Sequence, residues 1–332
     1  MVATESTQEN IGHLNLAATP CISVIVPFYN HAAFVQRRIE SLLAQTAGRL
    51  ELILLDDAST DNTDSLLRQW EHHPAVQCVC INTHNSGSPF LQWQRGLQLA
   101  RQEWVWIAEG DDYCDPDFIQ ALLPALTEPR CVLAYNEVRW VNEHDELLKA
   151  SQPQPARWYS GREFLARHMM LQDHLVNSGM LLFRRSALQG LPHRWTEMKQ
   201  AGDYLLWVQI AAQGKVYASG TEQAAFVRHS QSLSLQQLGS LTHLNESIEV
   251  QDEIVKHFPA FISIHRKYIL QQLIQTETGK NGMQLEEYAN RIKFWQAIAQ
   301  QRGGGFKLVH IRLLAFTAKF FHTLRKYLRQ ES

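Results

Sequence analysis

The sequence predicts an α/β fold in which a mostly parallel sheet is flanked by helices. Short apolar runs alternate with helical patterns through the first 140 residues, as expected when successive βα units pair their strands in parallel. The chain has 332 residues, of which 45% are hydrophobic, and this is enough for a sizeable core. From about residue 235 to residue 300 the pattern is helical, so we expect a C-terminal helical extension.

Five apolar runs are predicted as strands, over residues 22–26, 52–55, 76–81, 104–108 and 132–135. Four helices are predicted between them, over residues 34–45, 64–72, 91–101 and 118–126. Three consecutive glycines at 303–305 interrupt the later helical pattern. The predicted organisation is therefore an extension (1–20), the sheet domain (21–234), a helical region (235–302) and a basic amphipathic helix (303–332).

Composition excludes several classes of protein. The formal net charge is −2, from 31 Lys+Arg against 33 Asp+Glu, whereas a nucleic-acid partner favours a basic excess. No stretch approaches the roughly 18 apolar residues of a membrane-spanning helix, and residues 1–20 lack the features of a secretory signal. Five cysteines with no Cys-x-x-Cys pair argue against a disulfide framework or zinc site, so a cytoplasmic location is expected.

A first acidic cluster, Asp56-Asp57-Ala58-Ser59-Thr60-Asp61, directly follows the second predicted strand. Capping of the next helix explains one of these side chains, because Asp, Ser and Thr are preferred N-caps. It does not require two adjacent aspartates. A carboxylate at this edge of the sheet can also accept hydrogen bonds from a ribose hydroxyl or a base N–H, so both explanations remain open.

A second cluster, Glu109-Gly110-Asp111-Asp112, follows the fourth predicted strand. A turn and helix start account for Asp115-Pro116 but not for three carboxylates within four residues. Adjacent carboxylates repel each other unless a cation neutralises them, and hard divalent cations prefer carboxylate oxygens. We therefore expect Mg²⁺ or Mn²⁺ here. Asp203 begins a later amphipathic helix, and capping alone explains it.

Five segments taken in order resemble a family-2 glycosyltransferase of the GT-A fold, which has a Rossmann-like sheet. They match the first strand and its Pro-x-Tyr-Asn turn, the nucleotide motif, the loop and helix after the third strand, the DxD-type metal motif and the late acidic motif. In this chain those segments are 22–30, 56–61, 85–96, 109–112 and 202–207. The resemblance covers about residues 21–234.

For the donor, the resemblance implies a pocket lined by Pro27, Tyr29 and Asn30. Asp57 would accept from the nucleotide base. Gly87 lies in the loop that follows the third strand. Many members carry Arg where this chain has Trp93, so Arg95 becomes the candidate contact to phosphate.

For the metal, the resemblance implies Asp112 as main ligand of Mg²⁺ or Mn²⁺, with Asp111 near the donor ribose or sugar and a weaker ligand. His229, in a stretch similar to the family's Arg-x-His-x-x-Ser, is a further candidate. Asp203 would be the catalytic general base. Position 109 is Glu rather than the commoner Asp, and position 202 is Gly where many members have Glu.

The resemblance implies an inverting sugar transfer from a UDP-, GDP- or dTDP-sugar to a hydroxyl of a lipid-linked or saccharide acceptor. Synthesis of cell-surface polysaccharide or glycolipid is the expected setting. A sugar nucleotidyltransferase is the alternative enzyme, but it normally shows a Gly-rich, basic loop after the first strand, unlike Pro27-Phe28-Tyr29-Asn30. A non-catalytic scaffold of the same fold is the second alternative, and the intact carboxylates count against it.

Residues 306–329 predict a helix with one basic face and one face rich in aromatic and apolar side chains. Such a helix either packs on the protein with its basic side outward or lies on an anionic membrane surface. We favour the membrane, at the inner face, because acceptors in the family are often lipid-linked. From residue 303 onward the chain carries +5, which leaves −7 on the remainder.

Overall fold

The computed structural model describes residues 20–170, 173–229, 240–279 and 285–301. The basic segment 306–329 and nearly all of the N-terminal extension lie outside the described residues. Predictions made for those two segments therefore stay predictions.

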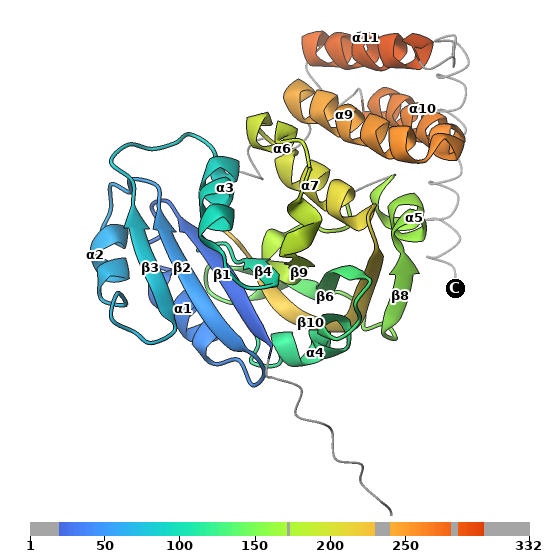
Figure 1. Ribbon diagram of the computed structural model, residues 1–332. Coiled ribbons are helices and arrows are strands. Elements are labelled where there is room, and N and C mark those ends of the chain that lie inside the picture. Colours follow the sequence, from blue (N-terminus) through green and yellow to red (C-terminus); the bar gives the residue numbers. More distant parts are fainter. Residues whose placement is uncertain (1–19, 171–172, 230–239, 280–284, 302–332) are drawn as a thin grey trace, which may run out of the picture.

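One sheet of ten strands forms the centre of the protein (Figure 1). Its strands are β1 (Cys21–Phe28), β2 (Arg49–Asp56), β3 (Val76–Ile81), β4 (Trp104–Ile107), β5 (Tyr113–Cys114), β6 (Cys131–Asn142), β7 (Leu147–Lys149), β8 (Arg157–Ser160), β9 (Leu181–Arg184) and β10 (Lys215–Arg228). Their order across the sheet is β3-β2-β1-β4-β9-β6-β10-β5, with β7 on β6 and β8 on β10.

The sheet is mostly parallel, as predicted. β1 pairs in parallel with β2 and with β4, and β2 pairs in parallel with β3. β9 runs antiparallel between β4 and β6, and β6 pairs in parallel with β10. The carboxyl ends of β1, β2, β3 and β4 consequently meet at one edge, where open α/β sheets bind their ligands.

The helices that cover the sheet are α1 (Val35–Leu43), α2 (Thr63–Arg68), α3 (Pro89–Leu99), α4 (Phe118–Leu126), α5 (Gly161–Phe164), α6 (Arg194–Glu197) and α7 (Gly202–Ala211). The four predicted helices correspond to α1–α4. Pro89 starts α3, where a missing N–H costs nothing because the first turn has no partner for it.

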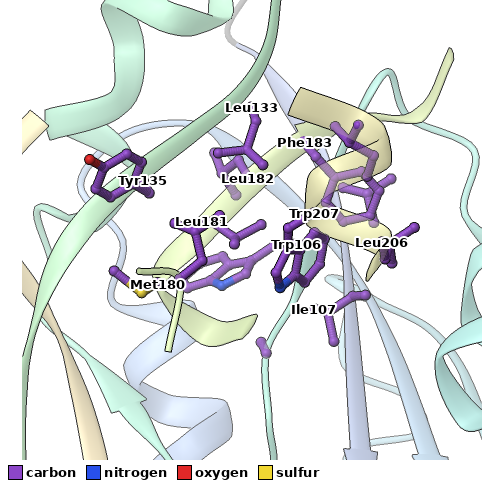
Figure 2. Close-up of a cluster of buried hydrophobic side chains, with 14 of the residues drawn as sticks. Trp106, Ile107, Leu133, Tyr135, Met180, Leu181, Leu182, Phe183, Leu206 and Trp207 are labelled. Carbon is purple, nitrogen blue, oxygen red and sulfur yellow. The ribbon is translucent and has the colours of Figure 1, made fainter. Parts of the chain in front are cut away.

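The core contains large side chains from both sides of β9 (Figure 2). Trp106 of β4 is fully buried and stacks on Phe118 of α4, with ring centroids 4.0 Å apart. Its indole Nε1–H donates to the carbonyl of Gly179 at 2.9 Å, so the ring is satisfied where it is buried. Gly179 belongs to the short 3₁₀ segment η2 (Ser178–Met180), which is thereby fixed beneath the acidic loop that follows β4.

Three helices follow the sheet domain: α9 (Leu241–His257), α10 (Ile262–Gly279) and α11 (Leu285–Gln301). They lie together beside α6 and α7 in Figure 1, and they confirm the predicted helical region wherever it is described. None of the helices in the described ranges is long and apolar enough to cross a membrane.

Glu246 joins this helical region to the sheet domain. The residue lies on α9, and its carboxylate accepts the backbone N–H groups of Lys199, Gln200 and Ala201 at 2.8–2.9 Å. Those three residues form the loop that leads into α7. A buried carboxylate with three N–H donors is a well-satisfied contact, so α9 fixes the start of α7.

Candidate active site

Asp57, at the end of β2, is buried and accepts four hydrogen bonds. Oδ1 accepts from the side chains of Asn82 and Gln92, each at 2.7 Å, and from the backbone N–H of Ser86 at 2.9 Å. Oδ2 accepts from the Ser86 hydroxyl at 2.7 Å. Because an ionised carboxylate has about four acceptor sites, two on each oxygen, Oδ2 retains acceptor capacity for a further donor.

Pro27, Tyr29 and Asn30 lie at the carboxyl end of β1. Asn30 has φ +55°, the left-handed conformation that Asn tolerates better than most residues. Its side-chain oxygen accepts from Thr60 N–H at 2.8 Å, which ties the end of β1 to the loop after β2. Tyr29 is 43% exposed, so its ring is available to a ligand.

Asp112 has both carboxylate oxygens engaged within the protein. Oδ1 accepts from Val227 N–H of β10 at 2.8 Å, and Oδ2 accepts from Asn177 Nδ2 at 2.6 Å. Burial and the neighbouring charge of Asp111 raise the pKa of Asp112 to about 7. The side chain therefore connects three segments: the loop after β4, the end of β10 and the segment before β9.

Asp111, in contrast, faces two imidazoles. Its Oδ2 lies 3.0 Å from His229 Nε2 and 3.9 Å from His31 Nε2, and the three side chains present ligand atoms within 4.8 Å of one another. Although burial acts in the opposite direction, the hydrogen bond with His229 lowers the pKa of Asp111. The same hydrogen bond raises the pKa of His229, whereas burial lowers the pKa of His31.

Glu109 is paired with Trp93. The indole Nε1–H donates to Oε1 at 2.9 Å, and the Ser178 hydroxyl donates to the same oxygen at 3.2 Å. Burial and the charges of Asp111 and Asp112 raise the pKa of Glu109 to about 8. In the absence of a cation, Glu109 therefore holds a proton at neutral pH and does not add to the local charge.

Asp203 lies in the first turn of α7 and accepts from Tyr204 N–H at 2.8 Å. Burial raises its pKa to about 6, and the charge of Glu246 acts in the same direction. Asp173 is close enough to feel this charge, because burial and then Asp203 raise the pKa of Asp173. A carboxylate with such a pKa is still ionised at neutral pH and is basic enough to accept a proton.

Gly202 precedes this aspartate for a steric reason. A Cβ at Gly202 would lie 2.3 Å from the carbonyl oxygen of Trp195 and 2.7 Å from the ring of Phe90. The Glu that is common here in the family resemblance has no room in this chain, which leaves Asp203 as the acid of that motif.

The first two turns of α3 contact all three acidic segments. Gln92 donates to Asp57, Trp93 donates to Glu109, and the Phe90 ring packs on Gly202 beside Asp203. Residues separated by up to 146 positions in the chain are thus brought to one place by five residues of one helix.

The other predicted site residues lie nearby. Gly87 has φ +71° and stands in the loop before α3, where a Cβ would meet open space among the described residues. Arg95 donates to the Asn82 side chain, which in turn donates to Asp57. Arg95 is therefore on the Asp57 side of α3, away from the carboxylates that follow β4.

Several residues in the site were not identified from the sequence, among them His31, Asn177 and Ser178. His31 directly follows the Pro27–Asn30 turn, and that position at a strand end was the available signal. Asn177 and Ser178 carry no such signal, because only the three-dimensional fold brings them beneath Asp112 and Glu109.

The fold and the order of its acidic segments define the class. The family described as "Glycosyl transferase family 2" matches residues 23–191, half of the chain, and the protein belongs to that family. The predicted resemblance and the predicted GT-A fold are confirmed.

Among individual relatives, the chain is 24% identical over 314 residues to the succinoglycan biosynthesis protein ExoO of Rhizobium meliloti, covering 91% of this chain and 89% of that one. It is 30% identical over 117 residues to a chondroitin synthase of Escherichia coli, covering 35% of this chain and only 17% of the synthase. The crystal structure of S. aureus TarS 1-349 in complex with UDP-GlcNAc has a TM-score of 0.66 at 17% identity, covering 94% of this chain and 92% of that one. This last likeness shows the shared fold.

Proposed function

We propose that the protein transfers a sugar from a nucleoside-diphosphate sugar to a hydroxyl acceptor, with inversion at the anomeric carbon, in cell-surface polysaccharide or glycolipid synthesis. The observation that carries the proposal is the contact of α3 with Asp57, Glu109 and Gly202. It assembles a base-binding carboxylate, a metal-binding loop and a candidate general base around one helix. Membership of the family and the names of the relatives support the same activity.

The donor nucleotide would bind across the ends of β1 and β2. Asp57 Oδ2 would accept an N–H of the base, while Tyr29 and Asn30 would line its pocket, with Gly87 leaving the loop before α3 open. The complex of TarS with UDP-GlcNAc makes a UDP-sugar the first donor to test.

The donor set at Asp111 fits a divalent cation, because a carboxylate and an imidazole stand side by side next to two further carboxylates. In our proposal Asp111 and His229 hold Mg²⁺ or Mn²⁺, and Asp112 orients the loop, since both its oxygens are already hydrogen-bonded. The cation would neutralise the negative charge that develops on the departing diphosphate.

Asp203 would be the general base. An acceptor hydroxyl is a weak nucleophile until its proton is removed in the transition state. A pKa raised to about 6 makes Asp203 a stronger base than an ordinary aspartate while keeping it ionised at neutral pH.

The first experiment identifies the donor by thermal shift. UDP-, GDP- and dTDP-sugars are tested with Mn²⁺, and a bound donor raises the melting temperature. With that donor, Asp203→Asn is expected to keep donor affinity and to lose about 10²–10⁴-fold in kcat. Glu71→Gln, an exposed residue outside the site, is the matched control. Unimpaired transfer by Asp203→Asn would remove the base assignment, and no response to any donor would remove the proposed activity.

We further propose that the acceptor is a saccharide or lipid-linked saccharide, approached at an anionic membrane surface through residues 306–329. Charge is the support for this step, since that segment holds six Lys/Arg and no acidic residue. Flotation with anionic vesicles tests it, comparing the chain with a Lys319→Glu/Arg325→Glu/Lys326→Glu variant. Equal flotation of both proteins would contradict membrane contact.

A further inference from the structure

His31 is held in a fixed place by the turn that follows β1. Its N–H donates to the Thr63 hydroxyl at 3.0 Å, and its carbonyl accepts from the N–H groups of Phe34 and Val35 at the start of α1. The left-handed Asn30 before it is tied to the loop after β2. The backbone on both sides of His31 is therefore determined by hydrogen bonds, and the direction of its side chain follows.

The ring of His31 packs edge-on against two aromatic rings. Its centroid lies 6.0 Å from that of Phe34 and 6.5 Å from that of Phe28. Phe34 also packs against His229, at 5.1 Å, so one phenyl ring supports both imidazoles. The two imidazoles meet at right angles with centroids 6.2 Å apart, and both direct Nε2 toward Asp111 Oδ2.

The polar atoms of His31 have no evident role in stabilising the fold. Within the described part of the chain, its buried Nδ1 has no hydrogen-bond partner. Its Nε2 is 3.9 Å from Asp111 Oδ2, longer than a hydrogen bond. A phenylalanine would pack here equally well, so the imidazole is explained only by what Nε2 can bind.

We propose that His31 is a third protein ligand of the cation, which makes the site a two-histidine, one-carboxylate set that prefers Mn²⁺ to Mg²⁺. This inference rests on the proposed function, because it adds a ligand to the metal site of that function. Imidazole nitrogen suits transition-metal ions, whereas Mg²⁺ prefers oxygen ligands and retains its waters. Three protein ligands leave the remaining positions of a six-coordinate ion open to diphosphate oxygens and water.

The test measures metal binding directly, without an activity assay. Mn²⁺ and Mg²⁺ affinities of the full chain are determined by calorimetry, and free Mn²⁺ is followed by EPR, with and without UDP. His31→Phe keeps the ring packing and removes both nitrogens, and His31→Gln is the second variant. His72→Phe, at an exposed histidine distant in sequence from the site, is the matched control.

We expect the wild-type protein to bind Mn²⁺ at least about tenfold more tightly than Mg²⁺, because two imidazoles favour the transition metal. His31→Phe should lose about tenfold or more in Mn²⁺ affinity and much less in Mg²⁺ affinity, so that the ratio of the two affinities falls. A loss of packing alone would weaken both metals equally and leave that ratio unchanged.

The outcomes separate this inference from the proposed function. If Asp111→Asn and His229→Phe lose Mn²⁺ while His31→Phe and His31→Gln bind it normally, the third ligand is wrong and the proposed metal site remains. If none of these variants changes Mn²⁺ affinity, the metal site itself is wrong. A wild-type ratio of Mn²⁺ to Mg²⁺ affinity near one also overturns the inference.

Discussion

Two departures from the family pattern turn out to be one contact. The chain has Trp93 where many members carry Arg, and Glu109 where Asp is commoner, and the Trp93 indole donates to the Glu109 carboxyl. The longer Glu arm reaches the indole, and its raised pKa leaves the pair without net charge at neutral pH. Sequence comparison alone treats the two positions separately, whereas the structure shows that each accounts for the other.

The pKa of Asp203 gives a prediction at this scale. Transfer requires the ionised carboxylate, so kcat is expected to fall as pH decreases through about 6. An ordinary aspartate would place this acid limb about two pH units lower. The pH dependence of kcat with saturating donor measures it, and a limb near pH 4 would contradict the prediction.

The same shift predicts a stability effect of known sign. Because the folded-state pKa is above the unfolded-state value, folding binds a proton between roughly pH 4 and 6, and the free energy of unfolding decreases as pH rises through that window. Asp203→Asn should therefore be more stable than wild type at pH 8, by on the order of 1–3 kcal/mol, and the difference should vanish near pH 3. Urea unfolding at both pH values checks this.

Among the elements, the loop after β4 shows how two adjacent aspartates take different roles. Asp112 accepts hydrogen bonds from Val227 and Asn177, whereas Asp111 faces the two imidazoles. Sequence predicted Asp112 as the main ligand because it matched a motif position. It could not show that β10 and the segment before β9, more than 60 residues later, supply donors to both Asp112 oxygens.

We expect Asp112→Asn to lower the free energy of unfolding by about 1–3 kcal/mol without metal, because one of the two donors loses its acceptor. Asp111→Asn should leave stability nearly unchanged and weaken Mn²⁺ binding at least about tenfold. Chemical unfolding and calorimetric titration of both variants measure the contrast. Normal stability of Asp112→Asn with loss of Mn²⁺ would restore Asp112 as the main ligand.

The predictability of the elements followed their hydrophobic pattern. The strands predicted at 22–26, 52–55, 76–81, 104–108 and 132–135 are all present, because each is a run of large apolar residues. β10 was not predicted: it is rich in small residues, and Gly220 at φ +72° lies at an irregularity in its pairing with β6. β9 is only four residues long, too short for periodicity to identify.

At the scale of the whole molecule, motif order predicted which segments form the site but not their contacts. Asp57, Asp111 and Asp203 were named from three separate motifs. The contacts of Gln92, Trp93 and Phe90 that join these motifs depend on how α3 packs on α7 and on the sheet. Those packing relations have no signature in a single sequence.

Glu246 extends the site into the helical region. Its three backbone acceptor contacts fix the loop before α7, and its charge contributes to the raised pKa of Asp203. Glu246→Gln should therefore lower kcat while leaving donor affinity unchanged, and should move the acid limb of the kcat profile below pH 6, because a negative charge near Asp203 is removed.

Glu253→Gln is the control for that prediction, since Glu253 lies on the same helix and pairs with Lys256 and His257 of α9. The pH dependence of kcat and the donor dissociation constant are measured for both variants. An unchanged acid limb in Glu246→Gln would show that α9 has no electrostatic effect on the base.

The Glu246 contact also bears on how such enzymes can be recombined. A chimera that joins residues 20–229 of this chain to the helices of a relative would exchange the acceptor of three N–H groups at the start of α7. The donor-binding half would be inherited intact, while the reactivity of Asp203 would travel with the foreign helices. Grafting an acceptor preference onto this protein therefore requires α9 to be transferred together with residues 199–203.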